Sequence, residues 1–309
     1  MSVTLASTTT NNSTTTSRLP SPAPIDHDDD EVTPLQPPTS SLPCGLRPQK
    51  SISITLTGPS IFTVSATLLL SIHYLGSRLT ECLVLVAPLV VLLRNDYENF
   101  LNLGPGGTPS TVYGYLQISW WRLWALRDPF TAPVVLSSSQ IGGILQKQGL
   151  PYRSGPRPIV AGIAPQRQLD QHGSRHSYQM LRRAMVKLGT RSPLRFGTER
   201  SCVEKHGLAL FAKYALRTNC QGEIVHVHDS DHSMHMCLHP DDIKVVLSKG
   251  WGQRHPLARN GWVLQMPVSP DFVMIYAPRY TTDEQELQIV YRIIEAAIWY
   301  TSEEKVSLS

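Results

Sequence analysis

The residues best suited to chemistry are histidines, and six of the eleven in this 309-residue chain fall within residues 223–257. In the stretch EIVHVHD, His226 and His228 alternate with apolar residues, and this period of two is typical of a strand with both imidazoles on one face. After a polar turn, SMHMCLH alternates in the same way around His235. If the two stretches pair as a hairpin, His235 lies close to His226 and His228. This hairpin is therefore the predicted reactive centre.

Three chemistries can use such a hairpin. Neutral imidazoles on one face, with Glu223 nearby, can chelate iron or zinc, but the glycine and proline spacing of a cupin is missing. In metal-free acid–base chemistry, a histidine takes a proton near neutral pH and Arg254 or His255 stabilises the anion. A hydrolase is the weakest option, because the serines and the cysteine of the hairpin lie in no G-x-S-x-G motif. His232 and His239 are expected to be solvated.

Composition limits the remaining classes of function. The first fifty residues contain no aromatic residue and are rich in Ser, Thr and Pro, so residues 1–58 are predicted to be a disordered tail. Asn11 and Asn12 begin N-x-S/T sequons, which predict a glycoprotein if the tail faces a lumen. A net charge of +4 with scattered basic residues gives no support to nucleic-acid binding. Five cysteines without CxxC spacing indicate neither a disulfide scaffold nor a zinc cluster.

The most apolar part of the chain runs over residues 61–93. A bilayer core takes about 20 helical residues to cross, so residues 59–93 are predicted to be a membrane anchor, either one tilted pass or a re-entrant hairpin bent near Arg78. A buried helical hairpin is the alternative. In residues 94–155, a helix bearing Trp120 and Trp124 lies either in the lipid headgroup layer or on the soluble domain. We expect a single-pass protein of an endomembrane such as the endoplasmic reticulum, with membrane lipid as a partner.

Residues 156–301 have the pattern of an α+β domain. Apolar alternation and capping signals predict strands and helices in turn, with a strand pair around Glu204 and His206 and a last helix opening on Thr282. Hairpins mixed with helices favour a mostly antiparallel sheet with flanking helices in two layers. The predicted order is thus a disordered tail, a membrane helix, a juxtamembrane connection and this domain.

Several motifs carry a resemblance to a known family. These are GWGQRHPLA at residues 250–258, IAPQRQ at 163–168, YAPR at 276–279, EIVHVHD, IIEAAIWY, the Glu204-x-His206 pair and RNDYENFLNLGP. Together they resemble the luciferase domain of bioluminescent mushrooms, over residues 80 to 301. Those enzymes are small membrane-anchored oxygenases that oxidise 3-hydroxyhispidin, a styryl pyrone, with dioxygen and no known cofactor. The stretches LGPGGTPSTVYGYL and LRDPFTAP are more similar to non-luminous fungal relatives. Light emission is therefore not implied.

The resemblance implies a membrane-anchored, cofactor-independent oxygenase that oxidises an enolic or phenolic pyrone- or polyketide-like molecule, in secondary metabolism. Its implied catalytic residues are His226, His228, His235, Arg254, His255, Glu204 and His206. Its implied substrate-binding residues are Arg167, Glu223, Trp251 and Tyr276. Dioxygen is the co-substrate, and neither a metal nor another cofactor is expected. The alternative is a non-catalytic, membrane-tethered protein that binds a small molecule. The sequence identifies no protein partner.

Overall fold

A computed structural model of the chain describes residues 58–75, 78–133, 142–217, 219–261, 264–279 and 284–308. The predicted disordered tail, with Asn11 and Asn12, lies outside the described residues. The elements in chain order are α1 (Gly58–Leu75), α2 (Arg78–Asn102), α3 (Val112–Arg122), α4 (Ile144–Gln148), β1 (Val160–Gly162), β2 (Gln166–Gln168), α5 (Arg175–Arg191), β3 (Phe196–Arg200), β4 (Leu208–Ala212), β5 (Glu223–Val227), β6 (Met234–Cys237), α6 (Pro240–Lys249), β7 (Gly252–Arg254), β8 (Phe272–Ile275) and α7 (Gln285–Ser302).

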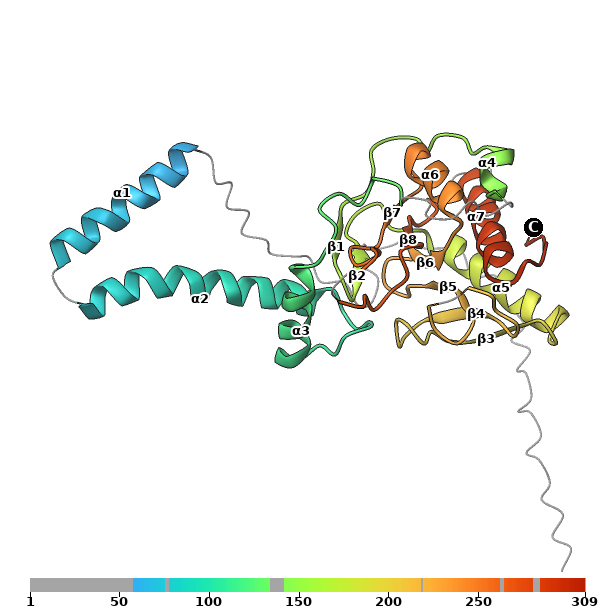
Figure 1. Ribbon diagram of the computed structural model, residues 1–309, viewed down its shortest axis with the longest axis horizontal. Helices are drawn as coiled ribbons and strands as arrows, with labels where there is room; N and C mark the ends of the chain where they lie inside the picture. The colour runs from blue at the N-terminus through green and yellow to red at the C-terminus, as the bar shows by residue number, and fades with distance from the viewer. Residues whose placement is uncertain are drawn as a thin grey trace, which may run out of the picture. The chain divides into compact units, whose positions relative to one another are not determined.

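A six-stranded antiparallel sheet lies at the centre of the α+β fold, in the order β3-β4-β5-β6-β8-β7. Helices α5, α6 and α7 pack against it, and β1 and β2 form a separate two-stranded sheet (Figure 1). The predicted hairpin is present as β5 and β6, and its register places His226 directly opposite His235. The α+β class and the antiparallel sheet are thus confirmed.

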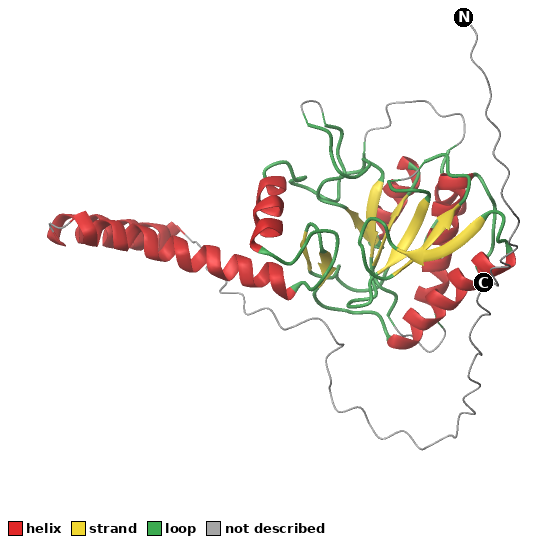
Figure 2. Ribbon diagram, turned by 90° about the horizontal axis from the view of Figure 1, so that it is seen from below, coloured by secondary structure: helices red, strands yellow, loops and turns green. Residues whose placement is uncertain are grey.

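The two faces of the β5–β6 hairpin have different roles. Val225, Val227 and Met236 point into the main hydrophobic core, to which α7 contributes Ile294. By the alternation of a strand, His226 and the residues in phase with it point to the opposite face. That face is also covered, because every residue of β5 and β6 is buried. Figure 2 shows several helices packed on one side of the large sheet, and loops with one further helix and the small two-stranded sheet on the other.

Local signals explain the ends of the helices around the sheet. Pro240 starts α6, the His239 side chain accepts a hydrogen bond from the Asp241 amide at 3.2 Å, and Gly250 ends the helix at φ 81°. His239 is therefore a buried cap, and the expectation that it is solvated was wrong. The N-cap of α7 is Glu284, and Thr282 lies outside the described residues.

The apolar segment 61–93 is divided between α1 and α2. Among the described residues, no helix combines the length and the apolar character needed to cross a membrane. Within α2 the uncharged run from residue 82 to 93 rises only about 18 Å, against about 30 Å of hydrocarbon. In α1, hydroxyl-bearing residues and His73 interrupt the apolar side chains. The prediction of one continuous pass through this segment is corrected to two helices.

Helix α3 has one packed side and one exposed side. Ile118 is buried in a cluster with Phe100, and Tyr115 donates a hydrogen bond to Asp96 of α2 at 2.8 Å. Trp120 and Leu123 are 53% and 71% exposed. One side of this helix therefore packs on the rest of the protein, as one of the two alternatives expected, and its other side presents aromatic and aliphatic side chains outward.

Candidate active site

Three imidazoles meet on the face of the sheet opposite the helices. Nε2 of His228 lies 3.0 Å from Nδ1 of His235, and the same Nδ1 lies 3.3 Å from Nε2 of His226. All three side chains are buried: His226 is 0% exposed, His228 is 2% exposed and His235 is 3% exposed. We call these three residues the histidine triad. The proximity predicted from the strand alternation is present, and it arises because β5 and β6 pair in register.

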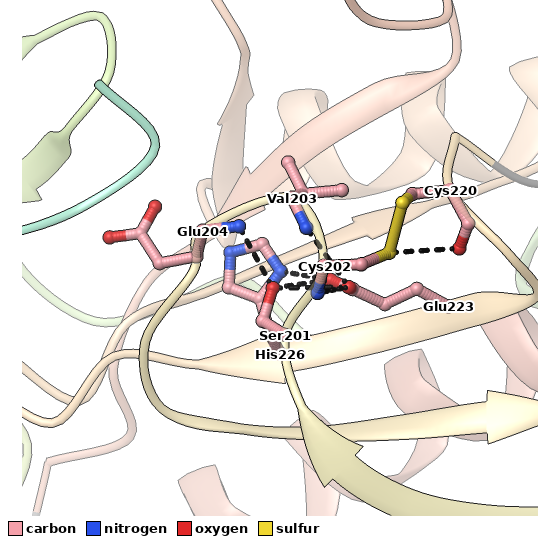
Figure 3. Close-up of a disulfide and its surroundings, with 7 residues drawn as sticks. All are labelled: Ser201, Cys202, Val203, Glu204, Cys220, Glu223 and His226. Carbon is pink, nitrogen blue, oxygen red and sulfur yellow. Dashed lines mark hydrogen bonds and ion pairs between the residues drawn. A yellow bond between two sulfur atoms is a disulfide. The ribbon is translucent and has the colours of Figure 1, made fainter. Parts of the chain in front are cut away.

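Glu223 fixes the first member of the triad. Its carboxylate accepts a hydrogen bond from Nδ1 of His226 at 2.5 Å, from the Ser201 hydroxyl and from the Cys202 amide at 2.7 Å (Figure 3). Burial favours the protonated acid, but the hydrogen bond and the charge of His226 outweigh it and lower the pKa of Glu223. The sequence-based list assigned Glu223 to substrate binding, whereas the structure places it behind the imidazole as a positioning residue.

The other two members have acceptors of their own. The Ser233 hydroxyl donates to Asp231 at 2.8 Å, so its oxygen accepts the proton on Nδ1 of His228, also at 2.8 Å. Nε2 of His235 donates to the side-chain oxygen of Gln166 at 2.9 Å. One nitrogen of each ring is therefore hydrogen-bonded to a partner outside the triad, and the other nitrogens point toward one another.

Electrostatics favour the neutral form of two members of the triad, His235 and His228. Burial lowers the pKa of His235 well below its usual value, and the neighbouring His228 and His226 lower it further. Burial and the nearby Arg167 also lower the pKa of His228. Burial opposes ionisation of Asp231, but its contacts with His228, the charge of Arg167 and the hydrogen bond from the Gln168 amide outweigh burial and lower the pKa of that carboxyl. His228 and His235 thus favour the neutral form, in which one ring nitrogen carries a lone pair.

A cavity of about 310 Å³ opens beside the triad. His226 and His235 line it together with His255 and Glu204. Apolar walls come from four separate parts of the chain, namely Ile118 and Trp121, Ile163, Leu257, and Phe272. The Phe272 ring stacks on His235 with centroids 5.2 Å apart. The segment predicted to be a juxtamembrane connection therefore supplies one wall of the cavity through α3.

A buried ion pair lies at the edge of this cavity. The Arg167 guanidinium bonds the Glu204 carboxylate, and their side chains are 3% and 7% exposed. Arg167 also donates to the Pro105 carbonyl at 2.7 Å, so it joins the loop before α3 to the sheet domain. A Cβ on Gly106 would meet the Glu204 carboxylate oxygen at 1.9 Å, so glycine is required where this loop crosses the pair. Of these residues, Glu204 faces the cavity directly.

His255 lines the cavity, but both of its nitrogens already have backbone partners. Nε2 donates to the Ile163 carbonyl at 2.9 Å, and Nδ1 accepts from the Leu257 amide at 3.1 Å. Burial lowers the pKa of His255 to about 4. His255 is therefore a neutral residue of the cavity wall, and both of its nitrogens are already used by the backbone.

Four further residues of the sequence-based site are not brought to this cavity. The Arg254 guanidinium donates to backbone carbonyls, including that of Thr131 at 3.2 Å, and therefore braces loops instead of facing a ligand. Trp251 lies in the main core, and the Tyr276 hydroxyl donates to Gln253 at 3.1 Å. His206 is exposed. The roles proposed for these four at the cavity find no support in their positions.

Several residues that hold the site were missed in the sequence. Gln166 and Ser233 carry no signal of their own, because their role depends on which imidazole lies beside them. A disulfide joins Cys202 to Cys220, although the cysteine spacing did not indicate one. Both cysteines line the cavity, and the Cys202 amide bonds Glu223. His232, predicted to be solvated, is buried and stacks on Tyr178.

Comparison with known proteins identifies the family of the chain. The model of the luciferase domain family matches residues 221–297, which include the whole histidine triad. A luciferase of Armillaria mellea is 32% identical over 251 residues, covering 75% of this chain and 91% of that protein. A luciferase of Neonothopanus nambi is 29% identical over 226 residues, covering 68% of this chain and 81% of its own length. No solved structure matches the chain significantly. The chain therefore belongs to the luciferase family of these fungi.

Proposed function

We propose that this protein uses dioxygen to oxidise an enolic or phenolic small molecule of the pyrone or polyketide type. The observation that carries the proposal is the cluster of three imidazoles, two of which line a mostly apolar cavity, in a chain whose relatives are luciferases. The cavity of about 310 Å³ matches a compound of one or two rings, since small-molecule sites begin at about 300 Å³.

The proposed reaction needs an electron-rich carbon. The enol loses its proton to a ring nitrogen of the histidine triad that faces the cavity. Two electrons then pass from the enolate carbon to dioxygen as a carbon–oxygen bond forms. The terminal oxygen of the resulting peroxide takes up a proton. The product is a hydroperoxide that contains both oxygen atoms. The apolar walls around Ile163 and Phe272 keep water from the reactive anion.

Oxygen uptake by the purified full chain tests this function. With a panel of hydroxypyrones, we expect dioxygen consumption equal to substrate loss, and incorporation of both atoms of labelled dioxygen into the first product. The matched control is the same pyrone with its enol oxygen methylated, which has no proton to lose and should consume no oxygen. Tight binding of the hydroxypyrone without oxygen uptake would instead show a non-catalytic binding protein.

We further propose that the exposed apolar side chains of α2 and α3 lie against a lipid surface. Leu89 and Leu93 of α2 are 56% and 50% exposed. Trp120 and Leu123, at the end of α3, are also exposed. Tryptophan beside aliphatic side chains suits the boundary between headgroups and acyl chains. Such attachment needs no helix that spans the bilayer.

Sedimentation with phospholipid vesicles tests the attachment. We expect the full chain to pellet with vesicles and the double variant Trp120→Ser, Leu123→Ser to bind several-fold more weakly, because both changes remove apolar area from the lipid. Leu194→Ser is the matched control, since Leu194 is 82% exposed but belongs to the turn after α5. Equal pelleting of all three proteins would contradict the proposal.

A further inference from the structure

When each ring is neutral, the inner nitrogens of the histidine triad are three acceptors with no hydrogen to share. Glu223 accepts from Nδ1 of His226, the Ser233 oxygen accepts from Nδ1 of His228, and the Gln166 oxygen accepts from Nε2 of His235. Carboxylate and amide oxygens cannot donate, and the Ser233 proton is already given to Asp231. Three lone pairs therefore face one another within hydrogen-bond distance. Such contacts are unfavourable unless a cation lies among them.

The spacing of these nitrogens fits a single metal ion. A metal about 2.0–2.1 Å from each imidazole nitrogen separates its ligands by roughly 2.9–3.4 Å, for angles between right and tetrahedral. Two of the separations in the triad, 3.0 and 3.3 Å, match this range. The third pair lies within 4.8 Å, and ligands of one ion are at most about 4.2 Å apart, so a small rotation of one ring completes the site. A proton could bridge one pair at a time, whereas a metal ion satisfies all three rings together.

The surroundings of the triad also match those of a metal site. Metal-binding histidines usually give their other ring nitrogen to a carboxylate, carbonyl or similar acceptor, which fixes the tautomer and the ring orientation. All three rings do this here. In the part of the chain that the structure describes, no other group of three histidine, cysteine or acidic side chains has its ligand atoms gathered in this way. The cluster is therefore distinct from ordinary buried histidines with one partner each.

We propose that His226, His228 and His235 bind one divalent transition-metal ion, with open positions directed at the cavity. Three neutral nitrogens and no carboxylate suit ions such as Zn²⁺, Fe²⁺ or Co²⁺, which accept imidazole, and disfavour Mg²⁺ and Ca²⁺. Because His226 and His235 line the cavity, a small molecule there reaches the remaining coordination positions. This inference stands independently of the proposed oxidation, and it replaces the sequence-based expectation that the site holds no metal.

Cobalt binding to the untagged full chain tests the proposal without substrate or oxygen. After treatment with a chelator and its removal, Co²⁺ should bind one equivalent per chain and give a visible absorption band. His235→Ala should lose the band, and Gln166→Leu, which keeps all three ligands, should weaken binding about 10–100-fold. His176→Ala, on the exposed surface of α5, should bind like the wild type. A wild type that holds no cobalt, or a His235→Ala protein that holds it equally, overturns the proposal.

Electron paramagnetic resonance of the Cu²⁺-loaded protein counts the nitrogens directly. Coupling to three imidazole nitrogens supports the triad, and coupling to one or none refutes it. If His235→Ala does not fold, as judged by circular dichroism, His228→Gln replaces it in both measurements. Failure of oxygen uptake with every hydroxypyrone, combined with one tightly held Co²⁺, would reject the proposed function and leave the metal site standing.

Discussion

Replacing His235 with asparagine is expected to reduce substrate turnover by about 10²–10⁴-fold, the usual effect of losing a positioned proton acceptor. His235 is the central member of the triad, because its Nδ1 contacts both other rings. Asparagine is polar but too short to keep the nitrogen at that point. The loss is expected whether the triad takes the enol proton itself or holds a metal ion that promotes its loss. Steady-state oxygen uptake with the best hydroxypyrone measures the effect.

Two controls separate this effect from damage to the fold. His176→Asn changes a histidine whose side chain is 51% exposed and should leave turnover unchanged. His206→Asn is the second control. The sequence predicted His206 to be catalytic, whereas the structure leaves it exposed, so this variant should also keep its turnover. Wild-type turnover in a folded His235→Asn protein would show that the triad is not the reactive centre.

Replacing Arg167 with methionine is expected to lower the free energy of unfolding by about 3–5 kcal/mol, the range for breaking one partner of a buried ion pair. The Glu204 carboxylate is left charged and 7% exposed, with its guanidinium partner removed. The Pro105 carbonyl also loses its donor, so the loop before α3 should loosen first. Urea unfolding followed by circular dichroism measures the change.

Two controls accompany this variant: one changes the other partner of the buried pair, and the other breaks an exposed pair. The double variant Arg167→Met, Glu204→Gln removes the stranded charge and should recover most of the loss. Arg195→Met breaks the surface pair with Glu304, whose side chains are 61% and 36% exposed, and should cost less than about 1 kcal/mol. Equal destabilisation by the Arg167 and Arg195 variants would show that burial does not set the strength of the pair.

Both predictions concern residues that meet at one cavity but come from distant parts of the chain. Gln166 and His235 are 69 positions apart, and Arg167 and Glu204 are 37 apart. The cavity wall from α3 is farther still from the triad in sequence. A change in the loop before α3 can therefore alter the shape of the site without touching a histidine.

The sequence by itself determined most of the strands and helices and the histidine hairpin, but not the short strands β2 and β7. Period-two alternation reports which residues share a face, and Pro240 and Gly250 mark helix ends through their own backbone preferences. These signals depend on residues close together in the chain, so they can be read without the fold. The pairing of His226 with His235 followed from them, because a short turn between alternating strands leaves few registers.

Only the tertiary structure decided what each side chain of the site faces. Arg254 and His255 share the GWGQRHPLA motif, yet the guanidinium braces loops while the imidazole lines the cavity. The sequence left the apolar segment 61–93 as one tilted pass or a hairpin bent near Arg78, and the structure has two helices, the second of which begins at Arg78. The acceptors behind the triad, Gln166 above all, became visible only when β2 was placed against β6. Such roles depend on contacts between residues far apart in sequence, and no local pattern encodes them.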